Sequence, residues 1–99
     1  MAIDADTKQA YQKKAKAQLD KLNAQIDELK AKSKQAKADA EIQYQEKLTE
    51  LYTKRDNAQV KFQELQQSSA EAWTEMQKGF ESAWTELNSA WESAISKFK

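Results

Sequence analysis

The residues of this chain that could do chemistry are carboxylates at helical spacing. Glu46 and Glu50 are four residues apart, as are Glu71 and Glu75, so each pair would project from one side of a helix. Metal sites built from such pairs in helical bundles also use histidines, and the chain has no His and no Cys. A single Gly cannot form a phosphate-binding glycine loop. We therefore expect no catalytic, cofactor-binding or metal-binding residues, no small-molecule substrate and no enzymatic activity.

Three lysines are a candidate electrostatic binding site. Lys30, Lys34 and Lys37 would lie on one flank of a helix, where they could bind nucleic acid or anionic lipid. The alternative is a solvated flank that faces acidic side chains of a neighbouring helix. Asp27 and Asp39 dilute the patch, and the 16 basic and 16 acidic residues of the chain cancel. We favour the solvated flank and expect no nucleic-acid partner.

The tryptophans are the most distinctive residues, and all three lie in the last 27 positions as Trp73, Trp84 and Trp91. A helix over 70–98 would place them, with Phe80 and Leu87, in adjacent rows of a wide apolar face. Such a helix fills a groove between other helices or lies on a lipid surface. The glutamates of its polar face disfavour an anionic membrane. We favour a place in the core and keep membrane binding through residues 70–98 as the alternative.

The elements that must position these residues are helices. Residue types with high helix propensity dominate the chain, whereas Pro is absent and Gly occurs once. Nothing interrupts residues 7–66, so one helix of about 60 residues and ~90 Å is expected there. Ser68 and Glu71 fit a capping box, which predicts a turn at about 66–69 and a second helix at about 70–98. The sequence thus predicts a single all-α domain over residues 1–99.

An apolar stripe follows one face of the first predicted helix. It runs from Tyr11 to Leu65 in 15 steps over 54 residues, which is 3.6 residues per step, and only Ser33 and Arg55 interrupt it with polar groups. The residues predicted to form the core and the self-association surface are Leu19, Leu22, Ile26, Leu29, Ala36, Ala40, Leu48, Leu51, Phe62, Leu65, Trp73, Phe80, Trp84, Leu87 and Trp91.

The unequal helix lengths predict a partner. A short helix covers only half of a long one, so the stripe near Leu19 would stay exposed in a single hairpin. We therefore expect an antiparallel coiled-coil homodimer with a three-helix bundle at each end. At its centre Ser33, Ala36 and Ala40 would face their own copies. The basic residues 1–38 would then lie beside the acidic remainder of the chain. The alternative is a monomeric three-helix bundle in which the long helix breaks near Ser33.

Three segments resemble a group of small bacterial coiled-coil proteins found in cyanobacteria and proteobacteria. They are QLDKLNAQIDEL at residues 18–29, KADA at residues 37–40 and SAWTEL at residues 82–87. Some members of the group carry a general stress-response label. The resemblance implies an all-helical soluble protein, and it brings no ligand and no catalytic residue to this chain.

Together these patterns favour a non-catalytic interaction or structural protein that self-associates. The alternatives are a peripheral membrane protein acting through residues 70–98, or a partner helix in place of lipid, and a designed bundle without a function. No stretch of the sequence approaches the ~18 apolar residues of a membrane span, and the N-terminus lacks an apolar signal segment. We therefore expect a cytoplasmic location.

Overall fold

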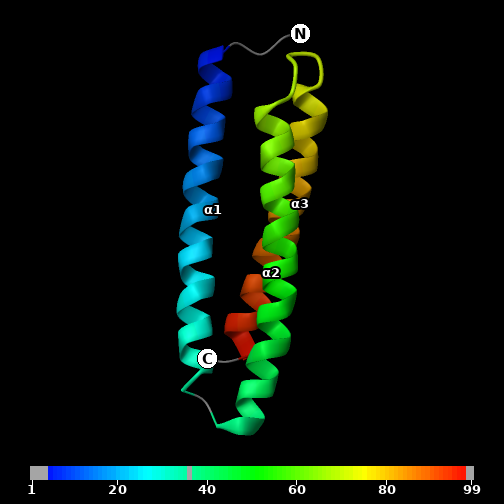
Figure 1. The fold of residues 1–99 in the computed structure, drawn as a ribbon. Coiled ribbons are helices and arrows are strands. Elements are labelled where there is room, and N and C mark those ends of the chain that lie inside the picture. Colours follow the sequence, from blue (N-terminus) through cyan, green and yellow to red (C-terminus); the bar gives the residue numbers. More distant parts are fainter. Residues whose placement is uncertain (1–4, 36, 98–99) are drawn as a thin grey trace.

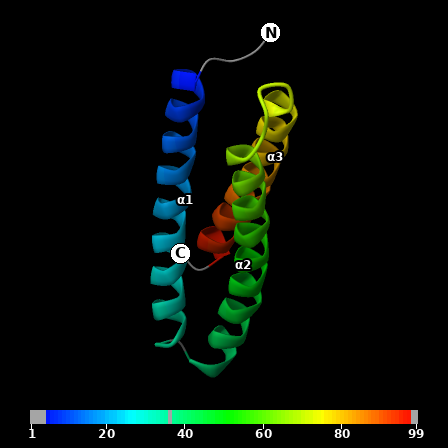
Figure 2. The ribbon, with the colours of Figure 1, turned by 45° about the horizontal axis from the view of Figure 1, so that its top comes forward.

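The described part of the chain forms three helices that pack as a bundle, each antiparallel to the next along the chain (Figure 1). The computed structural model describes residues 5–35 and 37–97, which contain α1 at Ala5–Ser33, α2 at Ala38–Gln66 and α3 at Trp73–Lys97. Figure 2 shows α3 crossing behind α2 so that its C-terminal end approaches α1. The described residues contain no strand, so the prediction of an all-α protein is confirmed. The molecule is a rod of 54 × 19 × 18 Å.

The predicted uninterrupted helix over residues 7–66 is wrong. α1 ends at Ser33 and α2 begins at Ala38, so the chain reverses direction between them. The two helices have 29 residues each, and the long axis of the molecule is 54 Å rather than ~90 Å. Three helices with a break beside Ser33 are what the alternative architecture predicted. The predicted dimer required one continuous helix through Ser33 and Ala40, and these two residues instead flank the connection between α1 and α2. Ala36, which was predicted to lie at the centre of that dimer, is outside the described residues.

The break has a physical cause in the packing of the helices. Helix stability in proteins comes mainly from burial of an apolar face, and the stripe carries no large side chain between Leu29 and Tyr44. A reversal of the chain in this segment therefore gives up little apolar burial. It brings Leu51 of α2 into one core with Ile26 of α1. The Ser33 hydroxyl donates to the Lys30 carbonyl at 2.6 Å, which satisfies one of the carbonyls that a helix end leaves free.

The second connection also differs from the prediction. The expected capping box would have the Ser68 hydroxyl accept from the Glu71 amide. Instead the Ser68 hydroxyl donates to the Leu65 carbonyl at 2.7 Å and so closes the end of α2. The Ser69 hydroxyl accepts from the amide of Ala72 at 3.2 Å. α3 therefore begins at Trp73, later than predicted, because the first of the two serines ends one helix and the second caps the next.

The core lies along the centre of the rod and contains most of the residues predicted for it. Eleven of the fifteen residues are buried: Leu19, Leu22, Ile26, Leu29, Leu48, Leu51, Phe62, Leu65, Trp73, Phe80 and Leu87. Trp84 and Trp91 are only partly buried, as is Ala40. Alanines at 15, 58, 83, 90 and 94 complete the core, and they allow the helices to approach one another closely.

α2 is the central partner of the bundle. It packs against both other helices, whereas no pair of described Cα atoms from α1 and α3 lies within 8 Å. Side chains alone bridge α1 and α3. A bundle of three helices with one wide seam leaves a groove along that seam.

Candidate interaction surface

A groove runs between α1 and α3 on the surface of the bundle. It consists of two hollows of about 400 Å³ and 260 Å³ that share Gln18 and Trp84, so they form one continuous feature. We call it the α1–α3 groove. Its α1 side is lined by Tyr11, Lys14, Ala15, Gln18, Lys21, Leu22 and Gln25. Its α3 side is lined by Phe80, Glu81, Trp84, Asn88, Trp91, Glu92 and Ile95.

The helical repeat explains why these side chains share the groove. Residues seven apart lie on one side of a helix, and the groove takes Lys14 with Lys21 from α1. From α3 it takes Trp84 with Trp91. The α3 row of Trp73, Phe80, Leu87 and Ala94 points into the core and is buried. The neighbouring tryptophan row is therefore the part of the apolar face that the single chain does not cover.

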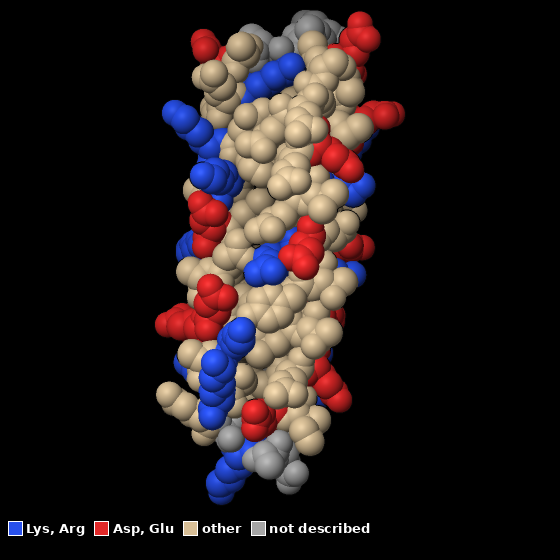
Figure 3. Space-filling model, in the orientation of Figure 1, with Lys and Arg blue, Asp and Glu red and all other residues tan. Residues whose placement is uncertain are grey.

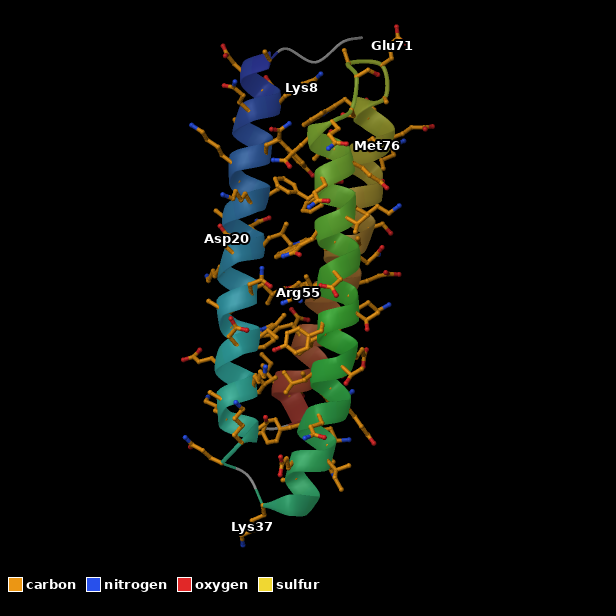
Figure 4. All side chains as sticks on the ribbon, in the orientation of Figure 1. Lys8, Asp20, Lys37, Arg55, Glu71 and Met76 are labelled. Atoms are coloured by element: carbon orange, nitrogen blue, oxygen red, sulfur yellow. The ribbon has the colours of Figure 1, made fainter. Side chains whose placement is uncertain are left out.

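An aromatic cluster closes the upper end of the seam, where α3 begins. The Tyr11 ring packs edge-on against Trp73, with ring centroids 5.8 Å apart, and against Phe80 at 6.4 Å. Phe62 of α2 contacts the same Phe80 ring at 5.7 Å. Lys8 extends from α1 toward this cluster (Figure 4), and its Nζ lies 5.4 Å from the Trp73 ring centroid. Below the cluster no aromatic contact between described residues joins α1 to α3, and the groove lies there.

One hydrogen bond joins the two sides of the groove. The Tyr11 hydroxyl donates to Glu81 Oε1 at 3.0 Å. Burial of the phenol, and then the hydrogen bond and the charge of Glu81, raise the pKa of Tyr11 to about 12. At neutral pH Tyr11 is therefore a neutral donor that ties α1 to α3.

The charges that line the groove are separated by sign. Lys14 and Lys21 lie on the α1 side, and Glu81 and Glu92 lie on the α3 side. None of these four side chains forms an ion pair within the described part of the chain. The helices differ in the same sense, because α1 has seven lysines against four acids and α3 has two lysines against four. Figure 3 shows the lysines of the α1–α2 face mostly along its α1 edge.

The polar interruption of the stripe at Arg55 is accommodated between α1 and α2 (Figure 4). Its guanidinium pairs with Asp56 at 2.9 Å and donates to Asn23 of α1 at 3.4 Å. The same group lies over the Tyr52 ring, 4.8 Å from the centroid. The Arg55 guanidinium therefore lies at the edge of the core, where these contacts satisfy its charge, and we assign no binding site to it.

The other candidate residues from the sequence form no further site in the described part of the chain. Glu46 and Glu50 are exposed on α2, and Glu50 pairs with Lys47 at 3.9 Å. Glu71 lies in the second connection rather than on α3 with Glu75. Of the three lysines, Lys30 belongs to the last turn of α1, whereas 34 and 37 lie in the first connection, so they do not share a helix flank.

Two absences hold for the described residues only. Within 5–35 and 37–97, no three carboxylates gather as they would around a metal ion. None of the helices, as far as they are described, is long and apolar enough to cross a membrane.

Comparisons of the chain with family models, curated proteins and solved structures gave no match. They do not bear on the resemblance to bacterial coiled-coil proteins, which stays a prediction. The sequence analysis did not predict the α1–α3 groove. A sequence signal for its α1 side is the seven-residue spacing of Lys14 with Lys21 and of Gln18 with Gln25, beside the apolar stripe.

Proposed function

We propose that this protein is a non-catalytic interaction module that self-associates through the α1–α3 groove. The observation that carries the proposal is the partly buried pair Trp84 and Trp91 in a groove that the single chain leaves open. Large aromatic side chains at the centre of a surface are typical anchors of protein interfaces. The groove offers apolar area, amide groups and charges, which are the groups that protein interfaces use.

A second copy of the chain has the size that this surface requires. A standard interface buries about 800 Å² on each partner. The bundle is 54 Å long and about 19 Å wide, so two rods lying side by side can bury that area. Contact along the whole groove would cover both tryptophans of each copy at once. The homodimer that we propose therefore consists of two intact three-helix bundles.

The test is the concentration dependence of the mass of the full chain, measured by sedimentation equilibrium. We expect a dimer that dissociates on dilution. Trp91→Gln is expected to raise its dissociation constant roughly tenfold or more, as interface anchors do. Val60→Gln is the matched control, because Val60 is a 50% exposed apolar residue of α2 outside the groove. A protein that stays monomeric to millimolar concentration would contradict the proposal.

Lipid is the rival occupant of the groove. Most of the apolar face of α3 is buried against the other helices, which leaves the tryptophan row alone for a membrane. Flotation with vesicles of phosphatidylcholine and phosphatidylserine separates the two proposals. We expect the protein to stay in the unbound fraction. Flotation that is lost in Trp84→Glu, from a protein that is monomeric in solution, would favour the membrane alternative.

A further inference from the structure

We infer that the second copy lies parallel to the first, with the two-fold axis of the dimer along the length of the bundles. This inference rests on the proposed self-association and adds to it the orientation and the residues that set it. The arrangement differs from the antiparallel dimer expected from the sequence, because its units are complete bundles and its contact is the α1–α3 groove.

The charges beside the groove carry the inference. Lys14 and Glu81 lie at one level of the rod, since both line the same hollow. Lys21 and Glu92 share the next level in the same way. At each level the lysine comes from α1 and the glutamate from α3. The surface therefore has a positive edge and a negative edge that run side by side along the rod.

Symmetry decides how two such surfaces meet. A dimer with a two-fold axis uses the same surface on both copies. When the axis runs along the rods, α1 of each copy lies over α3 of the other at the same level. Lys21 then faces the partner copy's glutamate at position 92, and Lys14 faces the one at position 81. The two tryptophan rows meet between these charged edges.

The antiparallel arrangement places like charges together. When the axis runs across the rods, α1 of one copy lies over α1 of the other, and α3 lies over α3. Lysines then face lysines, and glutamates face glutamates. Charges that flank an apolar seam set the orientation of paired helices in this way, because like charges disfavour the wrong partner geometry. The groove is therefore complementary to a parallel copy and repels an antiparallel one.

The first experiment exchanges the charges at one level of the groove, again by sedimentation equilibrium of the full chain. Lys21→Glu and Glu92→Lys each replace two attractive pairs in the dimer by repulsive ones. Each single variant is expected to raise the dissociation constant roughly five- to tenfold, as exposed ion pairs are individually weak. The double variant restores opposite charges and should return to within about twofold of the starting value.

Lys30→Glu is the matched control for this exchange. It makes the same charge change on α1 at an exposed lysine that does not line the groove. We expect its dissociation constant to change by less than about twofold. Thermal unfolding of every variant, followed by circular dichroism, shows whether the bundle itself is intact.

The second experiment measures the orientation directly by energy transfer. Thr74 and Ser96 are exposed residues near opposite ends of α3, about 33 Å apart along the helix. The chain has no native Cys, so Thr74→Cys and Ser96→Cys each take one dye. Donor-labelled and acceptor-labelled proteins are mixed to form dimers. We expect stronger transfer between two copies labelled at 74 than between a copy labelled at 74 and one labelled at 96.

The possible results separate the inference from the proposed function. Strong transfer between positions 74 and 96 indicates the antiparallel arrangement, and a Lys21→Glu variant that dimerises more tightly shows that Lys21 does not face a glutamate of the partner copy. Either result overturns the inference and leaves self-association intact. A chain that is monomeric at every concentration overturns both. Strong 74-to-74 transfer together with rescue in the double variant establishes the parallel dimer.

Discussion

At the scale of single residues, Tyr11 couples stability to pH. Its hydrogen bond to Glu81 joins α1 to α3, and its pKa of about 12 lies above the value of about 10 for an unfolded tyrosine. A raised pKa in the folded state stabilises the protein below pH ~10. That contribution is lost as the pH rises from ~10 to ~12.

We therefore expect the free energy of unfolding in urea to fall across this range in the native chain and much less in Tyr11→Phe. The tyrosinate absorbance of the native chain minus that of Tyr11→Phe gives the pKa of Tyr11 itself. Glu81→Gln, which removes the charge, should lower this pKa. Titration of Tyr11 near pH 10 in the intact protein would show that its phenol is neither buried nor bonded to Glu81.

Gly79 illustrates a residue whose small size the fold does not require. It lies in α3, its φ is not positive, and a Cβ built on it would meet only Lys61 Cδ, at 3.9 Å. That distance is ordinary van der Waals contact. Glycine in a helix costs stability because the unfolded chain has more freedom to lose.

Gly79→Ala should accordingly raise the free energy of unfolding by roughly 0.5–1 kcal/mol, measured by urea denaturation. Gly79→Leu provides a comparison in which the added side chain must displace the Lys61 stem. A destabilised Gly79→Ala variant would reveal that another surface approaches α3 at this position in solution.

At the scale of the elements, a substitution in the connection between α1 and α2 can increase the stability of the bundle. Lys37 is the N-cap of α2, with φ −67° and ψ 156°, and its side chain makes no capping bond. An Asp at this position can accept from the free amides of the first turn, and its charge suits the positive end of the helix. We expect Lys37→Asp to stabilise the bundle by about 1 kcal/mol.

The same substitution tests where the helix breaks. In an uninterrupted helix over residues 7–66, an Asp at position 37 would lie in the interior and destabilise. Lys37→Ala is the control that removes the lysine without adding a cap. The comparison of the two variants by thermal unfolding isolates the capping effect, and a more stable Ala variant would contradict the N-cap assignment.

The sequence predicts the class of fold and most of the core, because both depend on periodicity. The break between α1 and α2 was predicted only as the alternative, since the segment contains no Gly or Pro and the break forms because folding back buries Leu51 with Ile26. Its trace in the sequence is charge. Lys30 and Lys32 occupy the last turn of α1, as the helix dipole favours.

The seven-residue spacings on α1 mark one side of the groove, but the sequence does not show that the groove stays open. The rows of α3 follow from the helical repeat, and the row that begins at Trp73 is indeed buried. Which neighbouring row stays open depends on the spacing between α1 and α3, and the aromatic contacts of Tyr11 set that spacing at one end only. No local pattern encodes a distance between helices that are not consecutive in the chain.

At the scale of the whole molecule, shape separates a side-by-side dimer from an exchanged one. The Cα radius of gyration of one chain is 15.9 Å, above the ~13 Å of a compact domain of this length, because the bundle is a rod. Two rods in lateral contact thicken the particle and leave its length nearly unchanged. A dimer built on an unbroken helix would be ~90 Å long.

Small-angle scattering on the dimer should therefore give a maximum dimension well below ~90 Å, together with a cross-section larger than that of the monomer. Dilution of the same sample supplies the control, since the length should stay constant while the cross-section shrinks. A maximum dimension near ~90 Å would show that the first two helices join into one in the dimer.

The order of the helices along the chain also governs how the protein reaches its structure. α2 packs against the helices that precede and follow it, so the contacts between backbones join segments that are neighbours in sequence. Chains with such local contacts form quickly, on a scale of microseconds to milliseconds, because little loop entropy is lost before contacts are gained. α1 and α3 are not consecutive in the chain and meet through side chains alone. The groove between them can therefore form only when both the α1–α2 hairpin and the α2–α3 hairpin are in place.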